Sequence, residues 1–138
     1  MSTLSAHNTE NASGLRSAVD LLARILLVVL YLVAGYEKIP GYDYYAGYMQ
    51  SVGMPTALLP LVIAFELGSS VLIILGWQTR IVAFLQVGFT ILSALIFHNK
   101  LSDPIQQLMF LKNFAIAGGF LLLVVHGAGA YSLDARRR

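Results

Sequence analysis

The sequence contains no cysteine and few charged residues, and both shortages narrow the class of protein. Without cysteine, the chain cannot form disulfides, cysteine-ligated zinc or iron–sulfur sites, or thiol redox centres of its own. Charged residues make up only 12% of the 138 residues and hydrophobic residues 57%, and the mean hydropathy is +0.72. Such a chain cannot cover a water-soluble core with a charged exterior. The composition therefore indicates that lipid surrounds most of it.

Four apolar runs are each long enough to cross a membrane. A helix needs about 20 residues to cross roughly 30 Å of hydrocarbon, and runs of about that length cover residues 21–39, 56–77, 81–98 and 105–126. The runs are continuously apolar, as in membrane helices, and do not alternate as barrel strands do. The first run has no small-residue cleavage site at its end, so we treat it as a retained span. The sequence thus predicts an all-α integral membrane protein with a four-helix bundle.

The arrangement of basic residues predicts the orientation of the bundle. Lys and Arg are enriched in cytoplasmic loops, and on the side of both termini the sequence places Arg16, Arg24, Arg80 and the run 136–138. The opposite side has only Lys38 and Lys100. We therefore expect both termini in the cytoplasm, with Arg24 and Arg80 acting as orientation signals. Residues 1–17 are expected to be a disordered tail, 18–134 the membrane domain and 135–138 a basic tail. Membrane topology also explains the net charge of +2 without nucleic acid as a partner.

The first exterior loop, residues 41–55, is rich in tyrosine. Its four tyrosines are spaced to share a short helix lying at the headgroup level, where amphipathic rings are favoured: Tyr42, Tyr44, Tyr45 and Tyr48. We interpret this segment as an interfacial anchor, and a ligand-stacking role is the alternative.

Two charged residues lie within the apolar runs. A charge at the centre of a membrane helix costs about 2.5–3.5 kcal/mol on insertion scales, so such residues should face inward and find partners. Glu66 lies ten residues into the second run and Lys112 seven residues into the fourth. Both runs enter from the exterior side, so the two side chains reach similar depths and are predicted to form an ion pair. This pair could fix helix register or form a substrate or proton site.

Further polar residues predict a pocket that opens to the exterior. Lys38, His98 and Asn113 all lie in the exterior half of the bundle, near Glu66 and Lys112. For Lys38 alone, a side chain that extends to the interface is the competing explanation.

No motif for metal, haem or nucleotide binding is present. His98 and His126 end their runs on opposite sides and His7 lies in the tail, so one subunit cannot clamp a haem between two histidines. The sequence has no phosphate-binding loop, dinucleotide fingerprint or nucleophile elbow. We therefore predict no metal or cofactor site from the residues and no catalysis by this chain alone.

The order of several short motifs resembles the DoxX family of small inner-membrane proteins. The motifs are Arg24, Gly35-Tyr36-Glu37-Lys38, Glu66-Leu67-Gly68, Leu75-Gly76-Trp77-Gln78-Thr79-Arg80, Lys112-Asn113-Phe114, Gly118-Gly119 and the segment 127–134. The resemblance covers residues 20–134 and implies a four-helix protein of the bacterial inner membrane. Some relatives are linked to respiratory or sulfur redox complexes, including a small subunit of thiosulfate:quinone oxidoreductase, and others to oxidative-stress complexes.

These observations leave three functional hypotheses. The first is a non-catalytic accessory subunit of a membrane redox assembly, with quinone as a candidate ligand and other subunits of that assembly, or copies of the chain, as partners. The second is a small oligomeric transporter or proton-coupled carrier that uses Glu66 and Lys112. The third is a structural membrane scaffold in which the ion pair has no chemical role.

Overall fold

The chain folds into long helices joined by short turns. The structure is a computed structural model that describes residues 2–136, with side chains described from residue 11 onward. Within that part of the chain there is no strand, and the elements are α1 (Ser2–Glu37), α2 (Tyr42–Ser51), the 3-10 turn η1 (Thr56–Leu58), α3 (Leu59–Leu75), α4 (Thr79–Phe97), α5 (Pro104–His126) and α6 (Leu133–Arg136).

Four of these helical segments, among the residues described, are long and apolar enough to cross a membrane. They cover Asn11–Glu37, Thr56–Leu75, Thr79–Phe97 and Pro104–His126. The predicted all-α membrane bundle with four spans is therefore confirmed, and the predicted runs coincide with these segments to within a few residues except at the start of the first. The predicted short helix in the first loop is present as α2.

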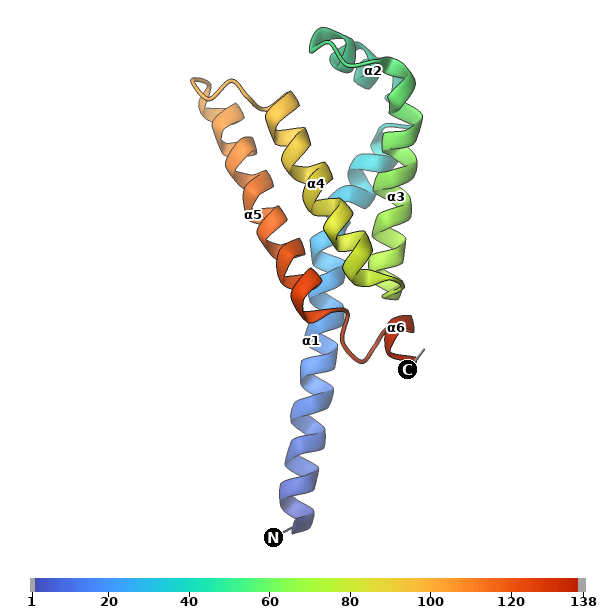
Figure 1. The fold of residues 1–138 in the computed structure, drawn as a ribbon, viewed down its shortest axis with the longest axis vertical. Coiled ribbons are helices and arrows are strands. Elements are labelled where there is room, and N and C mark those ends of the chain that lie inside the picture. The colour runs from blue at the N-terminus through green and yellow to red at the C-terminus, as the bar shows by residue number, and fades with distance from the viewer. Residues whose placement is uncertain (1, 137–138) are drawn as a thin grey trace.

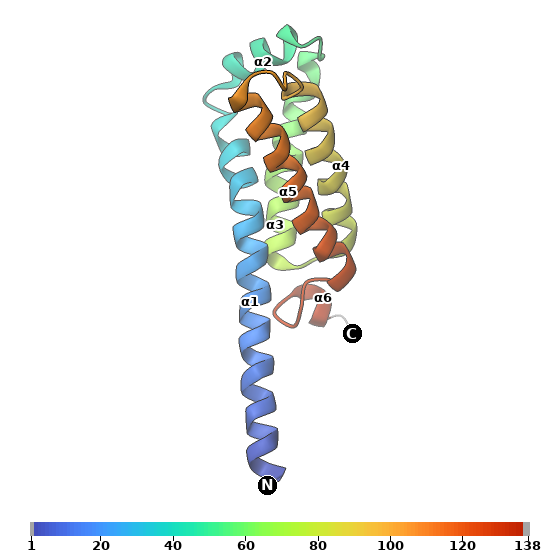
Figure 2. The same ribbon diagram turned by 90° about the vertical axis from the view of Figure 1, so that its left-hand side faces the viewer.

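Helix α1 is longer than the sequence analysis expected. It begins at Ser2, so the segment 2–17 is helical and continuous with the span, in place of the expected disordered tail. The segment carries no proline, and a helix already nucleated in the span propagates at little cost through residues that do not break it. Figures 1 and 2 show the resulting extension of α1 beyond the rest of the bundle.

The bundle consists of two helix pairs. Helix α1 packs along α3 and α4 packs along α5, while contacts between α3 and α4 are fewer and those between α1 and α5 fewer again. Figure 1 shows the pairs diverging toward the end that carries α2, here called the α2 end. Both termini lie toward the opposite end, the termini end, as an even number of crossings requires.

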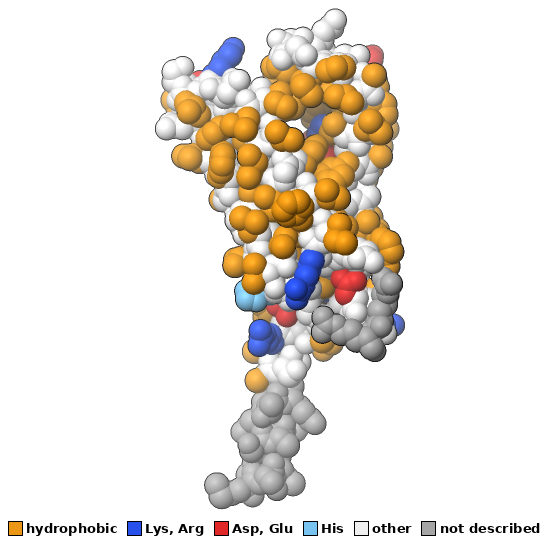
Figure 3. Space-filling view, in the orientation of Figure 1, with side chains coloured by type: hydrophobic (Ala, Val, Ile, Leu, Met, Phe, Trp, Pro, Cys, Tyr) orange, Lys and Arg blue, Asp and Glu red, His pale blue; other side chains and the backbone are white. Residues whose placement is uncertain are grey.

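Apolar side chains fill the bundle axis and also cover its outside. The buried core joins residues from all four spanning helices: Val28, Tyr31, Ile73, Val82, Ala83 and Phe120. Large apolar residues remain exposed on the outer faces; Leu26, Phe84 and Leu122 are each 63% exposed. Figure 3 shows this apolar surface over the bundle, with charged side chains gathered below it. Exposed leucines cost nothing in hydrocarbon, so such a surface is that of a protein in lipid.

At the termini end, Arg24 of α1 joins the end of α3 to the C-terminal segment. Its side chain is only 1% exposed, and Nη1 donates to the carbonyls of Ile73 and Ile74, each at 2.8 Å. Nη2 donates to the carbonyl of Tyr131. A guanidinium at the carboxyl end of α3 satisfies unpaired carbonyls and complements the helix dipole. Arg24 was expected to be an orientation signal near the interface; the structure shows it as a buried clamp, because the C-terminal segment folds back over it.

The C-terminal segment also caps helix α4. The carboxylate of Asp134 accepts hydrogen bonds from the backbone amides of Gln78 at 2.8 Å and Thr79 at 2.9 Å, and its own amide donates to the carbonyl of Gly76 at 2.9 Å. Gly76 adopts φ 73°, and a Cβ there would lie 2.3 Å from the Cβ of Ser132. The turn between α3 and α4 thus depends on a glycine and on the last residues of the chain.

Candidate functional site

A cavity of about 430 Å³ lies beneath α2, where the two helix pairs diverge. Its walls are mainly apolar and come from α2, α3 and α4; they include Met49, Leu59, Val62, Phe89, Ile96 and Phe97. The polar residues along it are Lys38, Tyr45, Tyr48, Ser93 and His98. Figure 3 shows a basic and an acidic side chain inside a hollow of the apolar surface near this end. An apolar cavity with few polar groups is the usual form of a small-molecule site.

An ion pair borders this cavity through its lysine. The Nζ of Lys38 lies 3.0 Å from Oε1 of Glu66 and 3.3 Å from Oε2. The side chain of Glu66 is 4% exposed and that of Lys38 is 16% exposed. Lys38 also donates to the carbonyl of Ala34 at 3.4 Å. An ammonium has three protons, and that of Lys38 faces three acceptors, the two oxygens of Glu66 and the carbonyl of Ala34.

The predicted pairing of Glu66 with Lys112 is wrong. Glu66 pairs with Lys38, and Lys112 is exposed on the outside of α5. The sequence analysis chose this partner by expected depth, but α3 packs against α1 while α5 packs mainly against α4. Matching depth along the membrane normal therefore did not identify the neighbour around the bundle. The flexible stem of Lys112 lets its ammonium extend toward the interface.

A glycine brings α1 close to α3 beside this pair. A Cβ on Gly35 would lie 2.9 Å from Cγ of Leu67 and 3.2 Å from Cβ of Glu66. Small residues permit such an approach of two membrane helices. Gly35 and Lys38 come from one motif and Glu66 and Leu67 from another, so the two motifs meet at this contact.

The four tyrosines of the first loop divide into two groups. Tyr45 and Tyr48 line the cavity; the ring centroid of Tyr45 lies 5.0 Å from Nζ of Lys38, and the hydroxyl of Tyr48 donates to the carbonyl of Phe97 at 3.0 Å. Tyr42 and Tyr44 are exposed, and their role as interfacial anchors stays a prediction.

Tyr45 is placed to donate a hydrogen bond. Its partial burial raises the pKa of the phenol above the ordinary value, and the nearby Glu37, Tyr44 and Glu66 add to the rise. The hydroxyl therefore keeps its proton at neutral pH.

His98 and Asn113 occupy different surroundings. His98 lines the cavity, and its Nδ1 lies 3.0 Å from Oε1 of Gln106. Asn113 instead donates to the carbonyl of Thr90 at 3.1 Å, which joins α5 to α4. Of the five predicted site residues, the structure thus brings Lys38 and His98 to the lining of one cavity, with Glu66 paired to Lys38, and leaves Lys112 and Asn113 outside the lining.

The sequence analysis missed two polar contacts deeper in the bundle. The hydroxyl of Tyr31 is hydrogen-bonded to Oγ1 of Thr90, and Nε2 of Gln86 donates to Oγ of Ser69 at 2.6 Å. Each joins a helix of one pair to α4 of the other. Helical periodicity places Gln86 and Thr90 on one face of α4, but it does not name their partners.

Within the described residues, no group of three or more His, Asp or Glu side chains is arranged to hold a metal ion. The polar groups at the cavity are the ammonium of Lys38, the phenols of Tyr45 and Tyr48, the hydroxyl of Ser93 and the imidazole of His98.

Comparisons with known proteins agree with this architecture. The DoxX family model matches residues 19–99. The chain is 46% identical over 114 residues to "Inner membrane protein YqjF" of Escherichia coli (strain K12), which covers 83% of this chain and 88% of the relative. It is 38% identical over 128 residues to "Inner membrane protein YphA" of the same organism, covering 88% and 91%. No solved structure matches the chain.

These matches and the four membrane-spanning helices found in residues 2–136 show a multi-pass protein of the inner membrane. The chain belongs to the DoxX family.

Proposed function

We propose that this protein is a non-catalytic subunit of an inner-membrane redox assembly and that it binds a quinone in the cavity beneath α2. The observation that carries the proposal is the ion pair of Lys38 and Glu66 at the edge of a mainly apolar cavity that Lys38 lines. The link to a redox assembly rests on the DoxX resemblance.

The cavity suits the chemistry of a quinone. A quinone carries two carbonyl oxygens, which accept hydrogen bonds, on a flat ring with an apolar tail. Lys38 and Tyr45 both line the cavity, so the charge of the ammonium attracts a carbonyl oxygen and the hydroxyl of Tyr45 can donate to one. Phe89 and Phe97 supply aromatic surface for the ring. The apolar walls suit a tail that arrives from the membrane.

Glu66 has a positioning role in this proposal. Its carboxylate keeps the ammonium of Lys38 at the cavity and offsets the cost of burying that charge. The chain itself binds and orients the ligand, and electron transfer belongs to other subunits of the assembly.

The test is the quinone content of the purified protein. The protein is extracted with its native lipids, and bound quinone is measured by mass spectrometry. Tyr45→Phe removes one donor and should lower retained quinone about fivefold, the effect of losing a typical hydrogen bond. Tyr42→Phe is the matched control, because Tyr42 is exposed and lies outside the cavity lining.

A second pair of variants tests the cavity itself. Val62→Trp fills it, whereas Leu61→Trp adds the same ring to a neighbouring residue that is 65% exposed and outside the lining. Only Val62→Trp should abolish retention. Absence of both quinone and any redox partner from the parent protein, or equal retention in each matched pair, would overturn the proposal.

A proton-coupled carrier is the second candidate, and one observation favours it. Buried polar contacts follow one another from the α2 end toward the termini end: Lys38–Glu66, then Tyr31–Thr90 and Ser69–Gln86. Proteoliposome flux driven by a pH gradient separates the candidates. If the protein is a carrier, the parent protein should show flux and Glu66→Gln should remove it. Background flux in both the parent and the variant would exclude the carrier function.

A further inference from the structure

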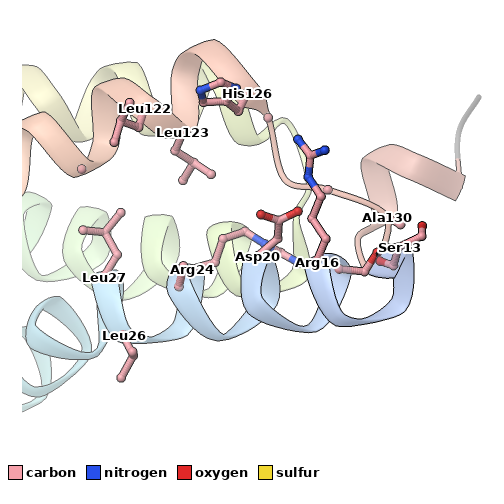
Figure 4. Close-up of a pocket in the computed structure, with 15 residues that line it drawn as sticks. Ser13, Arg16, Asp20, Arg24, Leu26, Leu27, Leu122, Leu123, His126 and Ala130 are labelled. Atoms are coloured by element: carbon pink, nitrogen blue, oxygen red, sulfur yellow. Dashed lines mark hydrogen bonds between the residues drawn. The ribbon is translucent and has the colours of Figure 1, made fainter. Parts of the chain in front are cut away.

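A second cavity, of about 870 Å³, lies at the termini end between α1 and the end of α5. Figure 4 shows it as a gap between these helices, closed on one side by the segment that follows α5. Helices α1 and α5 make few contacts with one another. Its size falls within the range of ligand pockets, roughly 300–1,000 Å³.

One part of this cavity is apolar. Its walls there are Leu26, Leu27, Gly119, Leu122 and Leu123. In Figure 4, Leu27 of α1 and Leu123 of α5 point toward one another across the gap. A Cβ on Gly119 would lie 3.1 Å from Cδ1 of Leu27, so the glycine keeps this part open.

The other part is polar and carries a net positive charge. Its charged residues are Arg16, Arg24 and Asp20, two cations and one anion, which gives +1 with His126 neutral. Arg24 is engaged by backbone carbonyls. The carboxylate of Asp20 faces the backbone of Gly129, where a Cβ would lie 2.7 Å from Oδ2. Arg16 is exposed and has no ion pair with any described residue.

Two hydroxyl groups and an imidazole complete the polar part. Ser13 and Ser17 belong to the same helix face as Arg16, and Oγ of Ser17 donates to the carbonyl of Ser13 at 2.9 Å. His126 ends α5 on the other side of the gap. The hydroxyl of Ser17 is thus already engaged, whereas Ser13 and His126 offer hydrogen-bond donors to an anion that Arg16 attracts.

The apolar and polar parts of the cavity are spaced like the acyl chains and the headgroups of one lipid leaflet. Leu27 and Arg16 are eleven residues apart on α1, or about 16 Å at 1.5 Å per residue. Exposed aromatic residues, Trp77 and Tyr131, are 41% and 52% exposed at this end and are typical of the membrane interface. The leucine wall therefore lies at acyl depth and Arg16 at headgroup depth.

We propose that this cavity binds an anionic phospholipid of the leaflet at the termini end, with its phosphate beside Arg16 and an acyl chain along Leu27, Leu122 and Leu123. A free anion would leave the leucine wall uncovered, and a zwitterionic lipid would bring a second cation of its own to a part of the cavity that already has a net positive charge. A phospholipid with net negative charge satisfies both parts at once.

The test compares lipids bound to the delipidated full chain in detergent. Equal amounts of phosphatidylglycerol and phosphatidylcholine are added, and retained lipid is counted by native mass spectrometry. The parent protein should prefer phosphatidylglycerol. Arg16→Gln should reduce that preference about fivefold, the effect of one basic residue near an anionic lipid. Arg136→Gln is the matched control, because Arg136 is exposed at the same end but does not line the cavity.

A second pair of variants tests the apolar wall. Leu122→Trp fills the cavity from a residue that is 63% exposed, so it leaves the core intact; Leu121→Trp, at 48% exposure and outside the lining, is its control. Leu122→Trp alone should lower the amount of bound phosphatidylglycerol. No headgroup preference in the parent, or equal results within either pair, would overturn the proposal. It would also fail if inorganic phosphate raised the unfolding temperature as much as the lipid did.

Discussion

Lys38 on α1 and Glu66 on α3 form an ion pair whose closest atoms, Nζ and Oε1, are 3.0 Å apart. The same contact joins two spanning helices and borders a cavity. Stability and ligand binding therefore depend on the same two side chains, and experiments must separate them.

Removing one member of this pair should cost more than removing both. Lys38→Met strands a carboxylate that is 4% exposed and should destabilise the protein by about 3 kcal/mol. Glu66→Gln should cost less, because Lys38 is 16% exposed and can turn its ammonium toward water. The double variant should regain most of the loss. Thermal unfolding in detergent measures this cycle.

Lys112→Met is the control for that cycle. Lys112 is exposed and outside the pair, so its substitution should leave stability within about 0.5 kcal/mol of the parent. If the costs of the two single variants simply added in the double variant, the ion pair would not be the coupling contact.

Arg24 should be among the most sensitive positions for stability. Arg24→Met leaves three carbonyl groups without their donor and should cost about 3 kcal/mol or more in the free energy of unfolding. Arg24→Lys keeps the charge, but one ammonium cannot reproduce the fork that spans α3 and the C-terminal segment, so an intermediate loss is expected. Arg136→Met, on the surface of α6, should change little. If Arg24→Met and Arg136→Met lowered the free energy of unfolding equally, the role of Arg24 as a buried clamp would be contradicted.

Alanine substitutions at two glycines, one within α3 and one directly after it, should change the stability of the protein in different directions. Gly76→Ala places a Cβ in a left-handed conformation, φ 73°, and 2.8 Å from Nη1 of Arg24; it should destabilise the protein by more than about 2 kcal/mol. Gly68→Ala adds a methyl group with nothing within 4 Å and should be neutral or stabilise by about 0.5–1 kcal/mol. Unfolding temperatures of the two variants test this difference, and a tolerated alanine at position 76 would contradict the described turn.

The orientation can be tested directly because the natural chain has no cysteine. Ser102→Cys lies in the loop between α4 and α5, and Arg136→Cys lies near the C-terminus. If the termini are cytoplasmic, a membrane-impermeant thiol reagent should label Ser102→Cys in intact spheroplasts and Arg136→Cys only after permeabilisation. The reverse pattern would place the α2 end in the cytoplasm.

The spans were predictable because lipid imposes one requirement on every crossing segment: an apolar helix of sufficient length. The third predicted run, 81–98, therefore lies close to Thr79–Phe97. The partner of Glu66 was not predictable in the same way, since hydropathy fixes depth but leaves open which helices are neighbours.

Arg24 illustrates a second limit. A rule based on position near a span end predicts that Arg24 is an interfacial residue. The short C-terminal segment that buries Arg24 has no helical or strand periodicity, so its fold could not be predicted from the sequence pattern. The tyrosines illustrate a third: their composition indicated an interfacial segment, but only the packing of α2 over α3 and α4 separates Tyr45 and Tyr48 from Tyr42 and Tyr44.

The bond from Arg24 to the carbonyl of Tyr131 joins residues 107 positions apart. During synthesis, the first helix must enter the bilayer long before the acceptor on Tyr131 has been made. The nascent protein therefore carries a guanidinium that lacks one of its three acceptors until residue 131 has been translated, although those on Ile73 and Ile74 are made earlier. Removing the segment 127–136 would leave every span in place and still prevent this last step of assembly.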